Sequence, residues 1–163
     1  MTSDTSPNAA FNTPARYFED IALGETYRIP SRTQTDALFA SFQLTSADNS
    51  PVHYDMEFCK AQGWPGLLAH GFQVLAQTCP GASDIHRSQG RISLRGIIEQ
   101  SSKFLKPVYS GDTLYPRLEV VELTPQRTTG VMTLRSTVHN QRDELVMDGR
   151  IKLLLNRRPR ESA

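Results

Sequence analysis

The stretch LLAHGFQVLAQTC, residues 67–79, is the most apolar candidate helix of the chain, and the arrangement of the other elements depends on it. We expect a helix from Ala69 to Cys79, ended by Pro80 and Gly81. The residues that we expect it to bury lie on most of its sides: Phe72, Val74, Leu75, Ala76 and Thr78. A helix that is apolar on most sides is buried inside a core, so the rest of the chain must wrap around it.

Four segments after residue 90 have the pattern of β-strands. They alternate apolar and polar residues or are rich in β-branched residues, and they cover residues 91–108, 112–123, 128–140 and 144–156. Clusters of turn-forming residues separate them. Four consecutive strands with such turns predict an antiparallel meander. One long central helix against one curved sheet is an α+β fold.

The segments before the central helix predict smaller elements. A turn at Gly24 precedes a short strand, and residues 36–46 form a helix. The buried stripe that we expect on this helix consists of Leu38, Phe39, Phe42 and Leu44. Asp55 and Gly63 mark the start and end of a shorter helix.

The two ends of the chain lack this periodicity. Residues 1–15 are rich in small polar residues and proline, and residues 158–163 are also polar. We therefore expect one domain over residues 16–157, with a tail on each side.

The composition restricts the class of partner. The chain has 163 residues, of which 18 are basic and 17 acidic, with a formal net charge of +1. This balance favours neither nucleic acid nor an anionic membrane as a partner. No apolar run approaches the roughly 20 residues needed to span a bilayer, and we see no secretory signal. Two cysteines, Cys59 and Cys79, in a chain without an export signal indicate a cytoplasmic protein with reduced thiols.

The predicted architecture also has a consequence for assembly. A curved sheet covered by one helix leaves an open edge strand, whose backbone groups can pair with another chain. Pairing with a second copy removes this edge, so we expect a homodimer.

Asp48 and His53 form the first candidate site, in the irregular segment TSADNSPVHYD, residues 45–55. Helical spacing does not bring these two side chains together, but a turn at residues 49–51 can. An acidic side chain beside an imidazole suits general acid–base chemistry on a water molecule or a substrate. The alternative is that Asp48 caps the turn and His53 is an ordinary loop histidine.

His70 and Gly71 form the second candidate site, at the start of the central helix. The first N–H groups of a helix lack carbonyl partners and, with the helix dipole, favour negative charge. A glycine at this place lets a ligand oxygen approach the backbone closely, as an oxyanion site requires. The alternative is that Gly71 only allows the helix to pack closely against the sheet.

The remaining candidates are weaker. His86 and His139 lie in polar, turn-like surroundings that are typical of surface histidines. The sequence has no CxxC or HxxxH pair, so we expect no metal site, and no GxGxxG or P-loop spacing indicates a nucleotide. Ser50, His53 and Asp55 have the residue types of a nucleophilic triad, but they lie within one turn of chain without a strand-to-helix elbow.

Three motifs in this order resemble the MaoC-like branch of the hot-dog superfamily, which includes the (R)-specific enoyl-CoA hydratases. Residues 48–53 are similar to the family's Asp-x-Asn-Pro-x-His pattern. Residues 69–71 match its Ala/Val-His-Gly helix start, and SSKFLKPVYSGDTL, residues 101–114, resembles its Phe-x-x-Pro-Val-x-x-Gly-Asp strand and turn. The resemblance covers about residues 18–156.

The resemblance implies a hot-dog fold, in which a curved antiparallel sheet wraps a long central helix, expected as a dimer. It also implies a lyase of fatty acid metabolism that adds water reversibly to a trans-2-enoyl thioester, giving (R)-3-hydroxyacyl-CoA. Asp48 and His53 would act on the water, and the N–H of Gly71 would bind the thioester oxygen. Coenzyme A enters as part of the substrate rather than as a cofactor, and an acyl-carrier protein is the alternative carrier.

One position departs from the family pattern. Ser50 stands where the family has asparagine, and Asn49 precedes it. The Asp48–His53 pair is intact, so we expect a hydratase, with Asn49, Ser50 and His70 shaping the loop or contacting the substrate. Two other interpretations stay open: a non-catalytic acyl-CoA-binding hot-dog protein, and an acyl-CoA thioesterase, which the motif fits poorly.

Overall fold

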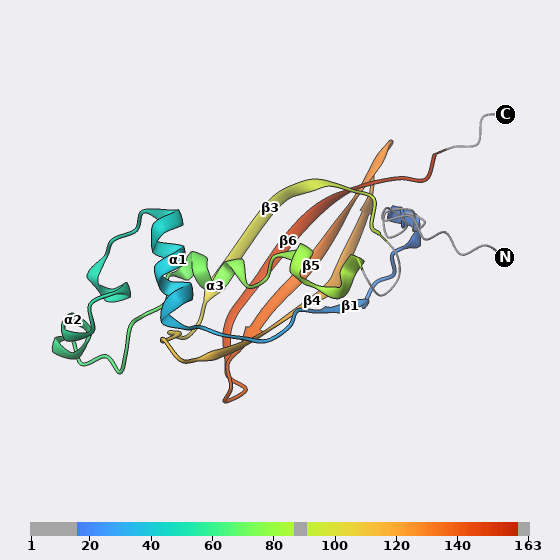
Figure 1. The fold of residues 1–163 in the computed structure, drawn as a ribbon. Helices are drawn as coiled ribbons and strands as arrows, with labels where there is room; N and C mark the ends of the chain where they lie inside the picture. The colour runs from blue at the N-terminus through green and yellow to red at the C-terminus, as the bar shows by residue number, and fades with distance from the viewer. Residues whose placement is uncertain (1–15, 87–90, 160–163) are drawn as a thin grey trace, which may run out of the picture.

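A curved antiparallel sheet is the main element of the computed structural model, which describes residues 16–86 and 91–159 (Figure 1). The predicted tail over residues 1–15 lies outside the described residues. The sheet has six strands in the order β1-β4-β5-β6-β3, with β2 also paired to β4. The strands are β1 (Thr26–Arg28), β2 (Arg32–Thr33), β3 (Leu94–Phe104), β4 (Thr113–Pro125), β5 (Thr129–His139) and β6 (Leu145–Asn156).

The four predicted long strands are present, but the predicted four-strand meander is wrong. Strands β4, β5 and β6 form a meander, whereas β3 pairs with β6 and not with β4. The connection over residues 105–112 is too long for a tight hairpin. It instead pairs with the segment before the third helix, since Ala69 N donates to Val108 O at 2.8 Å and Ser110 N donates to Leu67 O at 2.9 Å. This pairing leads the chain across the end of the sheet and leaves β3 as an edge strand.

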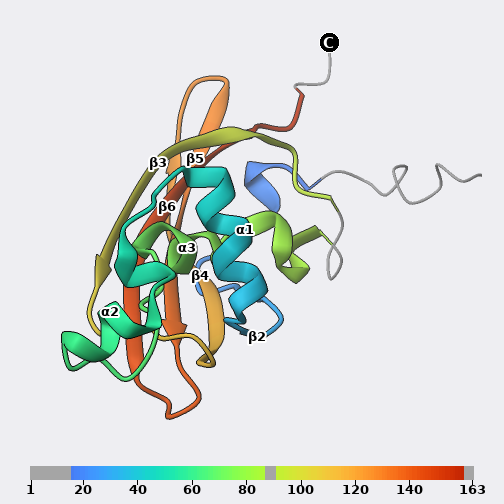
Figure 2. The ribbon, with the colours of Figure 1, turned by 60° about the vertical axis from the view of Figure 1, so that its left-hand side comes forward.

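The α-helices of the described residues are short and lie on one side of the sheet, toward one of its ends (Figures 1 and 2). They are α1 (Asp36–Ser46), α2 (Met56–Ala61) and α3 (Gly71–Ala76). Single 3₁₀ turns accompany them: η2 (Phe18–Asp20), η3 (Pro51–His53), η4 (Pro80–Ala82) and η5 (Asp84–His86). The α+β arrangement expected from the sequence is therefore confirmed.

The central helix is shorter than predicted. It begins at Gly71 rather than Ala69, because the backbone of Ala69 is paired with Val108. Near its other end, Thr78 Oγ1 donates to Leu75 O at 2.7 Å, and Cys79 takes the extended geometry that a following proline favours. The predicted burial also fails at Phe72, which is 73% exposed, and at Ala76, which is exposed as well.

The two other helices agree better with the sequence. Helix α1 covers the predicted residues, and Phe39 is buried, although Leu44 is 86% exposed and does not belong to the buried stripe. Helix α2 has Asp55 as its N-cap, with the carboxylate accepting from Phe58 N at 2.9 Å. Gly63 follows it with φ +76°, a left-handed conformation that favours glycine.

The apolar core consists of two clusters along the sheet. The larger one packs β-strand side chains against the N-terminal segment, and its most buried members include Tyr27, Leu118, Met132 and Leu155. The smaller one joins the helices to the sheet and contains Phe39, Ala69, Val74, Val108, Leu114, Val138, Val146 and Met147. Because the smaller cluster includes residues on both sides of His70 and Gly71, it fixes the start of α3 on the sheet.

The start of the predicted C-terminal tail, at residue 158, contacts the N-terminal segment. Arg158 N donates to Glu19 Oε2 at 2.9 Å, and its guanidinium pairs with Asp20, so Arg158 is held by η2. Residues 160–163 lie outside the described part of the chain. Within the described part, none of the helices has the length and apolar character to cross a membrane.

Candidate active site

The end of α1 brings Asp48 back toward His53. Ala47 ends the helix in a left-handed conformation with φ 56°. The carboxylate of Asp48 then accepts from Ser50 N at 3.2 Å, which closes a turn of the kind that aspartate favours. Pro51 starts the η3 turn, and His53 ends it. As a result, His53 Nε2 lies 3.8 Å from Asp48 Oδ2, so the structure places the first predicted pair together.

The two members of this pair have different surroundings. The side chain of His53 is 10% exposed, while that of Asp48 is 51% exposed. His53 Nδ1 lies 2.6 Å from the carbonyl oxygen of Leu68, which can only accept, so Nδ1 carries a proton. The neutral ring therefore presents an unprotonated Nε2 toward Asp48. A separation of 3.8 Å is too long for a direct hydrogen bond, but one water oxygen can contact both atoms.

His70 joins this pair from the start of α3. Its side chain is buried, and its ring stacks on that of His53 with centroids 3.6 Å apart and an interplanar angle of 23°. His70 Nε2 lies 3.4 Å from the backbone oxygen of Asp48, and Phe42 of α1 packs at a centroid distance of 4.9 Å. The second predicted site is thus continuous with the first.

Gly71 lies between this cluster and an apolar pocket. The pocket has a volume of about 380 Å³ and is lined by Leu68, Ala69, Gly71, Val74 and the segment 104–108. A Cβ atom on Gly71 would lie 3.2 Å from Cε2 of Phe104, which is half exposed. Gly71 is the first residue of α3. Its N–H group therefore has no carbonyl partner within the helix.

Other residues singled out from the sequence lie around this site or away from it. Asn49 Oδ1 accepts from Gln43 Nε2 at 2.8 Å, so this side chain fixes the loop to α1. Asp55 caps α2, with its carboxylate accepting from Phe58 N. His139 lines a different pocket, together with outward residues of β4 and β5. The side chain of His86 lies outside the described residues.

Sequence reasoning missed two residues behind His70. Gln73 on α3 and Gln34 after β2 are 1% and 0% exposed. Gln73 Oε1 lies 3.2 Å from His70 Nδ1, and Gln73 Nε2 donates to Gln34 Oε1 at 3.1 Å. The signal for Gln73 was a polar residue inside an apolar helix, three positions after a candidate histidine. No comparable signal marks Gln34.

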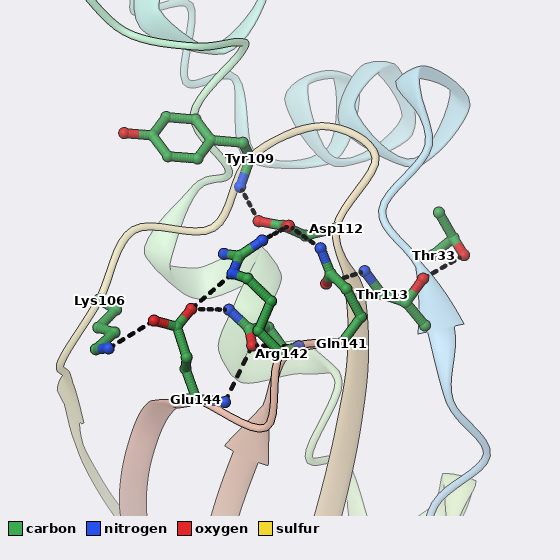
Figure 3. Close-up of polar contacts among 9 residues, drawn as sticks. Thr33, Lys106, Tyr109, Asp112, Thr113, Gln141, Arg142 and Glu144 are labelled. Atoms are coloured by element: carbon green, nitrogen blue, oxygen red, sulfur yellow. Dashed lines mark hydrogen bonds and ion pairs between the residues drawn. The ribbon is translucent and has the colours of Figure 1, made fainter.

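The Gly-Asp turn of the third motif carries a dense polar network (Figure 3). Gly111 has φ +92°, and Asp112 is only 7% exposed. Its carboxylate accepts from Tyr109 N at 2.9 Å and from Gln141 Nε2 at 2.6 Å, and it faces Arg142 Nη1 at 3.5 Å. The turn is thus tied to the hairpin between β5 and β6.

Glu144 completes this network on the hairpin side (Figure 3). Its carboxylate accepts from Asn140 Nδ2 at 2.7 Å, Lys106 Nζ at 2.8 Å and Arg142 Nε at 2.9 Å. The hydrogen bonds from Asn140, Lys106 and Arg142, in that order, lower the pKa of Glu144 to about 2. The network therefore joins the connection after β3 to the start of β6.

The same turn also holds Gln34. Gln34 N donates to Asp112 O at 2.8 Å, and Gly111 N donates to Gln34 O at 2.9 Å. A continuous series of contacts therefore leads from the Gly-Asp turn through Gln34 and Gln73 to His70.

One cluster in the described part of the chain has the residue types of a metal site. Donor atoms of Asp48, His53 and His70 lie within 4.8 Å of one another. The lone pairs of Nε2 lie in the planes of the two stacked rings, which are nearly parallel, whereas a metal ion needs lone pairs that converge on one point. The geometry therefore suits proton transfer better than metal binding, and the absence of a metal stays a prediction.

The chain is similar in sequence to a known family and to several known proteins. The model of the MaoC like domain matches residues 19–141. A 3-hydroxybutyryl-CoA dehydratase of Methylorubrum extorquens is 26% identical over 82% of this chain and 80% of its own length. An (R)-specific enoyl-CoA hydratase of Rhodospirillum rubrum is 27% identical over 74% of this chain and 79% of its own.

Solved structures show the same fold. A monoamine oxidase regulatory protein of Archaeoglobus fulgidus superposes with a TM-score of 0.81 and 32% identity, over 89% of this chain and 97% of its own. A Mycobacterium tuberculosis protein described as a double hot-dog fold superposes with a TM-score of 0.73 and 28% identity, over 91% of this chain and 46% of its own. The predicted hot-dog fold is therefore confirmed, and the chain belongs to the MaoC-like family.

Proposed function

We propose that the protein adds water reversibly to a trans-2-enoyl-CoA thioester and forms an (R)-3-hydroxyacyl-CoA. The observation that carries this proposal is the placement of Asp48 and His53, whose facing atoms are 3.8 Å apart beside an apolar pocket. The names of two relatives, a 3-hydroxybutyryl-CoA dehydratase and an (R)-specific enoyl-CoA hydratase, describe reactions of this class, which supports the assignment.

In this proposal a water molecule binds between Asp48 Oδ2 and His53 Nε2. Both atoms accept hydrogen bonds, so they orient the water oxygen toward the β-carbon of the enoyl group. The new C–O bond forms at the β-carbon while one O–H bond of the water breaks and its proton passes to the pair. A proton is then delivered to the α-carbon on the same face. The dehydration reaction follows the same steps in reverse.

Negative charge develops on the thioester oxygen during this addition. We assign its stabilisation to the N–H of Gly71, which lies in the open first turn of α3 next to the stacked histidines. A single donor of this kind is worth about 3 kcal/mol of barrier height. The missing side chain of Gly71 leaves space for the thioester, and the apolar pocket beside it receives the acyl chain.

We further propose that the working form is a homodimer of the cytoplasm. Strand β3 is an edge of the sheet, and its Ile97 and Ile98 side chains are 57% and 53% exposed. Exposed isoleucines on an open edge favour pairing with a second copy. Cys59 and Cys79 are both free thiols, which accords with a reducing compartment.

The test is to mix the purified protein with crotonyl-CoA and follow the loss of the enoyl-thioester absorbance. Asp48→Asn runs in parallel, and a thiol reagent is present in a separate cuvette. We expect decay with the parent protein, none with Asp48→Asn and no free thiol. The configuration of the product then tests the (R) assignment, and a crotonyl carrier-protein thioester tests the choice of carrier.

Two results would contradict the proposal. Release of free thiol would identify a thioesterase. Tight binding of a panel of longer and branched enoyl-CoAs without any chemical change would identify a binding protein.

A further inference from the structure

Gln34 and Gln73 lie behind the stacked histidines and touch neither the proposed water nor the apolar pocket. Both side chains are essentially inaccessible to solvent. A buried amide is costly unless its hydrogen bonds are made. The hydrogen bonds of these two side chains therefore indicate their role, and the series of bonds leads to His70.

The orientation of the first amide follows from a backbone carbonyl. Gln34 Nε2 lies 3.3 Å from the oxygen of Arg32, which can only accept, so the NH₂ group of Gln34 faces it. Gln34 Oε1 then accepts from Gln73 Nε2 at 3.1 Å. Reversing both amides would place the oxygen of Gln34 against the oxygen of Arg32, two acceptors in contact.

The orientation of the second amide favours a proton on one of the two ring nitrogens of His70. With its NH₂ group directed to Gln34, Gln73 presents Oε1 to His70 Nδ1 at 3.2 Å. An amide oxygen only accepts, so His70 Nδ1 carries a proton. His70 Nε2 also faces an acceptor, the backbone oxygen of Asp48, but at 3.4 Å this contact is longer than the 3.2 Å contact of Nδ1. We therefore assign the single proton of the neutral ring to Nδ1 and leave Nε2 unprotonated. His53 has the same tautomer for a similar reason, because its Nδ1 faces the carbonyl of Leu68.

We propose that Gln34 and Gln73 are positioning residues that hold His70 in the Nδ1–H tautomer. The site then contains two stacked imidazoles with unprotonated Nε2 atoms on the side of Asp48, both ready to accept a proton. A proton on His70 Nε2 would gain the oxygen of Asp48, 3.4 Å away, as its acceptor. The tautomer is a property of the folded chain, while its benefit to catalysis rests on the proposed hydration reaction.

The Gly-Asp turn holds the backbone of Gln34 in place. The backbone of Gln34 is held on both sides by residues 111 and 112, and Asp112 is itself fixed by the network in Figure 3. The third sequence motif therefore acts on the site through Gln34, although Asp112 does not touch the site's histidines.

The decisive experiment is a long-range ¹H–¹⁵N spectrum of the intact protein labelled with ¹⁵N-histidine, at neutral pH. The chain has 4 histidines, and loss of one signal set in His70→Asn assigns His70. We expect its Nδ1 to be protonated and its Nε2 unprotonated. A proton on Nε2 of the neutral ring would overturn the proposal. The tautomer is read from the unmodified protein, and the folded His70→Asn variant is needed only to assign the signals.

A matched pair of variants tests the role of the amides. Gln73→Met keeps the length of the side chain and removes both hydrogen bonds, and we expect the Nε2–H form of His70 to appear. Gln77→Met is the control, because Gln77 lies on the same segment and, among the described residues, its side chain bonds the backbone oxygen of Gln73, at 3.1 Å. An unchanged His70 tautomer in folded Gln73→Met would contradict the role of the amide pair.

Activity measurements separate this inference from the proposed function. In Gln73→Met we expect kcat to fall roughly 10- to 100-fold with little change in KM, since a reacting group is misplaced while the binding pocket is intact. Gln77→Met should change neither. An inactive parent protein with the Nδ1–H tautomer would reject the hydratase proposal alone. An active parent protein with Nε2–H on His70 would reject the positioning role alone.

Discussion

Two aspartates, Asp48 and Asp112, lie in turns of the same fold and both belong to motifs recognisable in the sequence. Asp112 is 7% exposed and accepts well-formed hydrogen bonds from Tyr109 N and Gln141 Nε2. The side chain of Asp48 is 51% exposed, and its one clear hydrogen bond, from Ser50 N, is 3.2 Å long. A carboxylate whose acceptor sites are filled holds a structure together, whereas one with open sites can bind a water or a substrate.

The neighbours of the two carboxylates differ in the same way. Around Asp112, the charged groups Lys106, Arg142 and Glu144 are paired with one another. Around Asp48, the neighbours are His53 and His70, whose charge changes with a single proton. The first region is thus suited to a fixed arrangement of charge and the second to a changing one.

The largest effect that would test this contrast is on activity at Asp48. We expect Asp48→Asn to lower kcat for crotonyl-CoA hydration by roughly 100- to 10,000-fold, because the amide cannot take the water's proton. Since Asp48 is half exposed and holds only one turn, the melting temperature should stay nearly unchanged. His53→Ala should lose activity to a similar degree. Near-parent activity in either folded variant would remove the pair from the mechanism.

Asp112→Ala should lower the stability of the protein more than its activity, the reverse of Asp48→Asn. It leaves Tyr109 N and the amide of Gln141 without their buried acceptor, which costs about 1–3 kcal/mol. For a chain of this size, this corresponds to a fall of roughly 2–10 °C in melting temperature. Activity per folded molecule should fall far less than in Asp48→Asn, because Asp112 reaches the site only through Gln34.

A surface acid provides the control for Asp112. Glu57 pairs with Lys60 on α2, and both side chains are mostly exposed. Glu57→Ala should change stability by less than about 1 kcal/mol. Equal melting temperatures for Glu57→Ala and Asp112→Ala in a thermal scan would show that Asp112 is not the structural carboxylate of the comparison.

Gly71→Ala tests whether Gly71 serves the reaction or only the packing of α3. The new methyl group would meet the ring of Phe104 at 3.2 Å, but this ring is half exposed and can move. We therefore expect a stability loss below about 1 kcal/mol. The methyl group also occupies the space of the thioester, so kcat should fall roughly tenfold or more.

A second substitution separates the two causes in Gly71→Ala. Combining it with Phe104→Leu relieves contact with the ring and should restore stability without restoring kcat. If stability and kcat fall and recover together, Gly71 serves helix packing and not an oxyanion site.

Local patterns were enough to predict part of this molecule. Apolar spacing located α1 and the four long strands, and Asp55 marked the start of α2, because these signals depend only on neighbours in the chain. The spacing of Asp48 and His53 around Pro51 was also informative, since a turn there joins them.

Other features depend on residues far apart in the sequence. Strand β3 lies beside β6 because its following connection pairs with residues 67–69, and the same pairing shortens α3. Gln34 belongs to the site only because a turn at residues 111–112 holds its backbone. No pattern within a short window contains such contacts, so the role of Gln34 behind His70 could not be predicted.

The smallest expected effect concerns Glu144, at the exposed rim of the Asp112 network. Hydrogen bonds from Asn140, Lys106 and Arg142 lower the pKa of Glu144 to about 2 from an ordinary value of 4.5. A lowered pKa means that the carboxylate stabilises the folded state above about pH 4.5. This contribution is lost as the pH falls from that value through about 2, where the folded state also binds the proton.

Glu144→Gln should therefore lower the melting temperature slightly at pH 7, and the difference from the parent should shrink as the pH approaches 2. Thermal scans by circular dichroism at several pH values measure this. Asp143→Asn is the control, because Asp143 lies in the same turn and forms no ion pair within the described residues. A difference that stays constant with pH would assign the effect of Glu144 to its shape. A difference that disappears only below pH 4.5 would assign it to charge and place Glu144, like Asp112, among the fixed carboxylates of the fold.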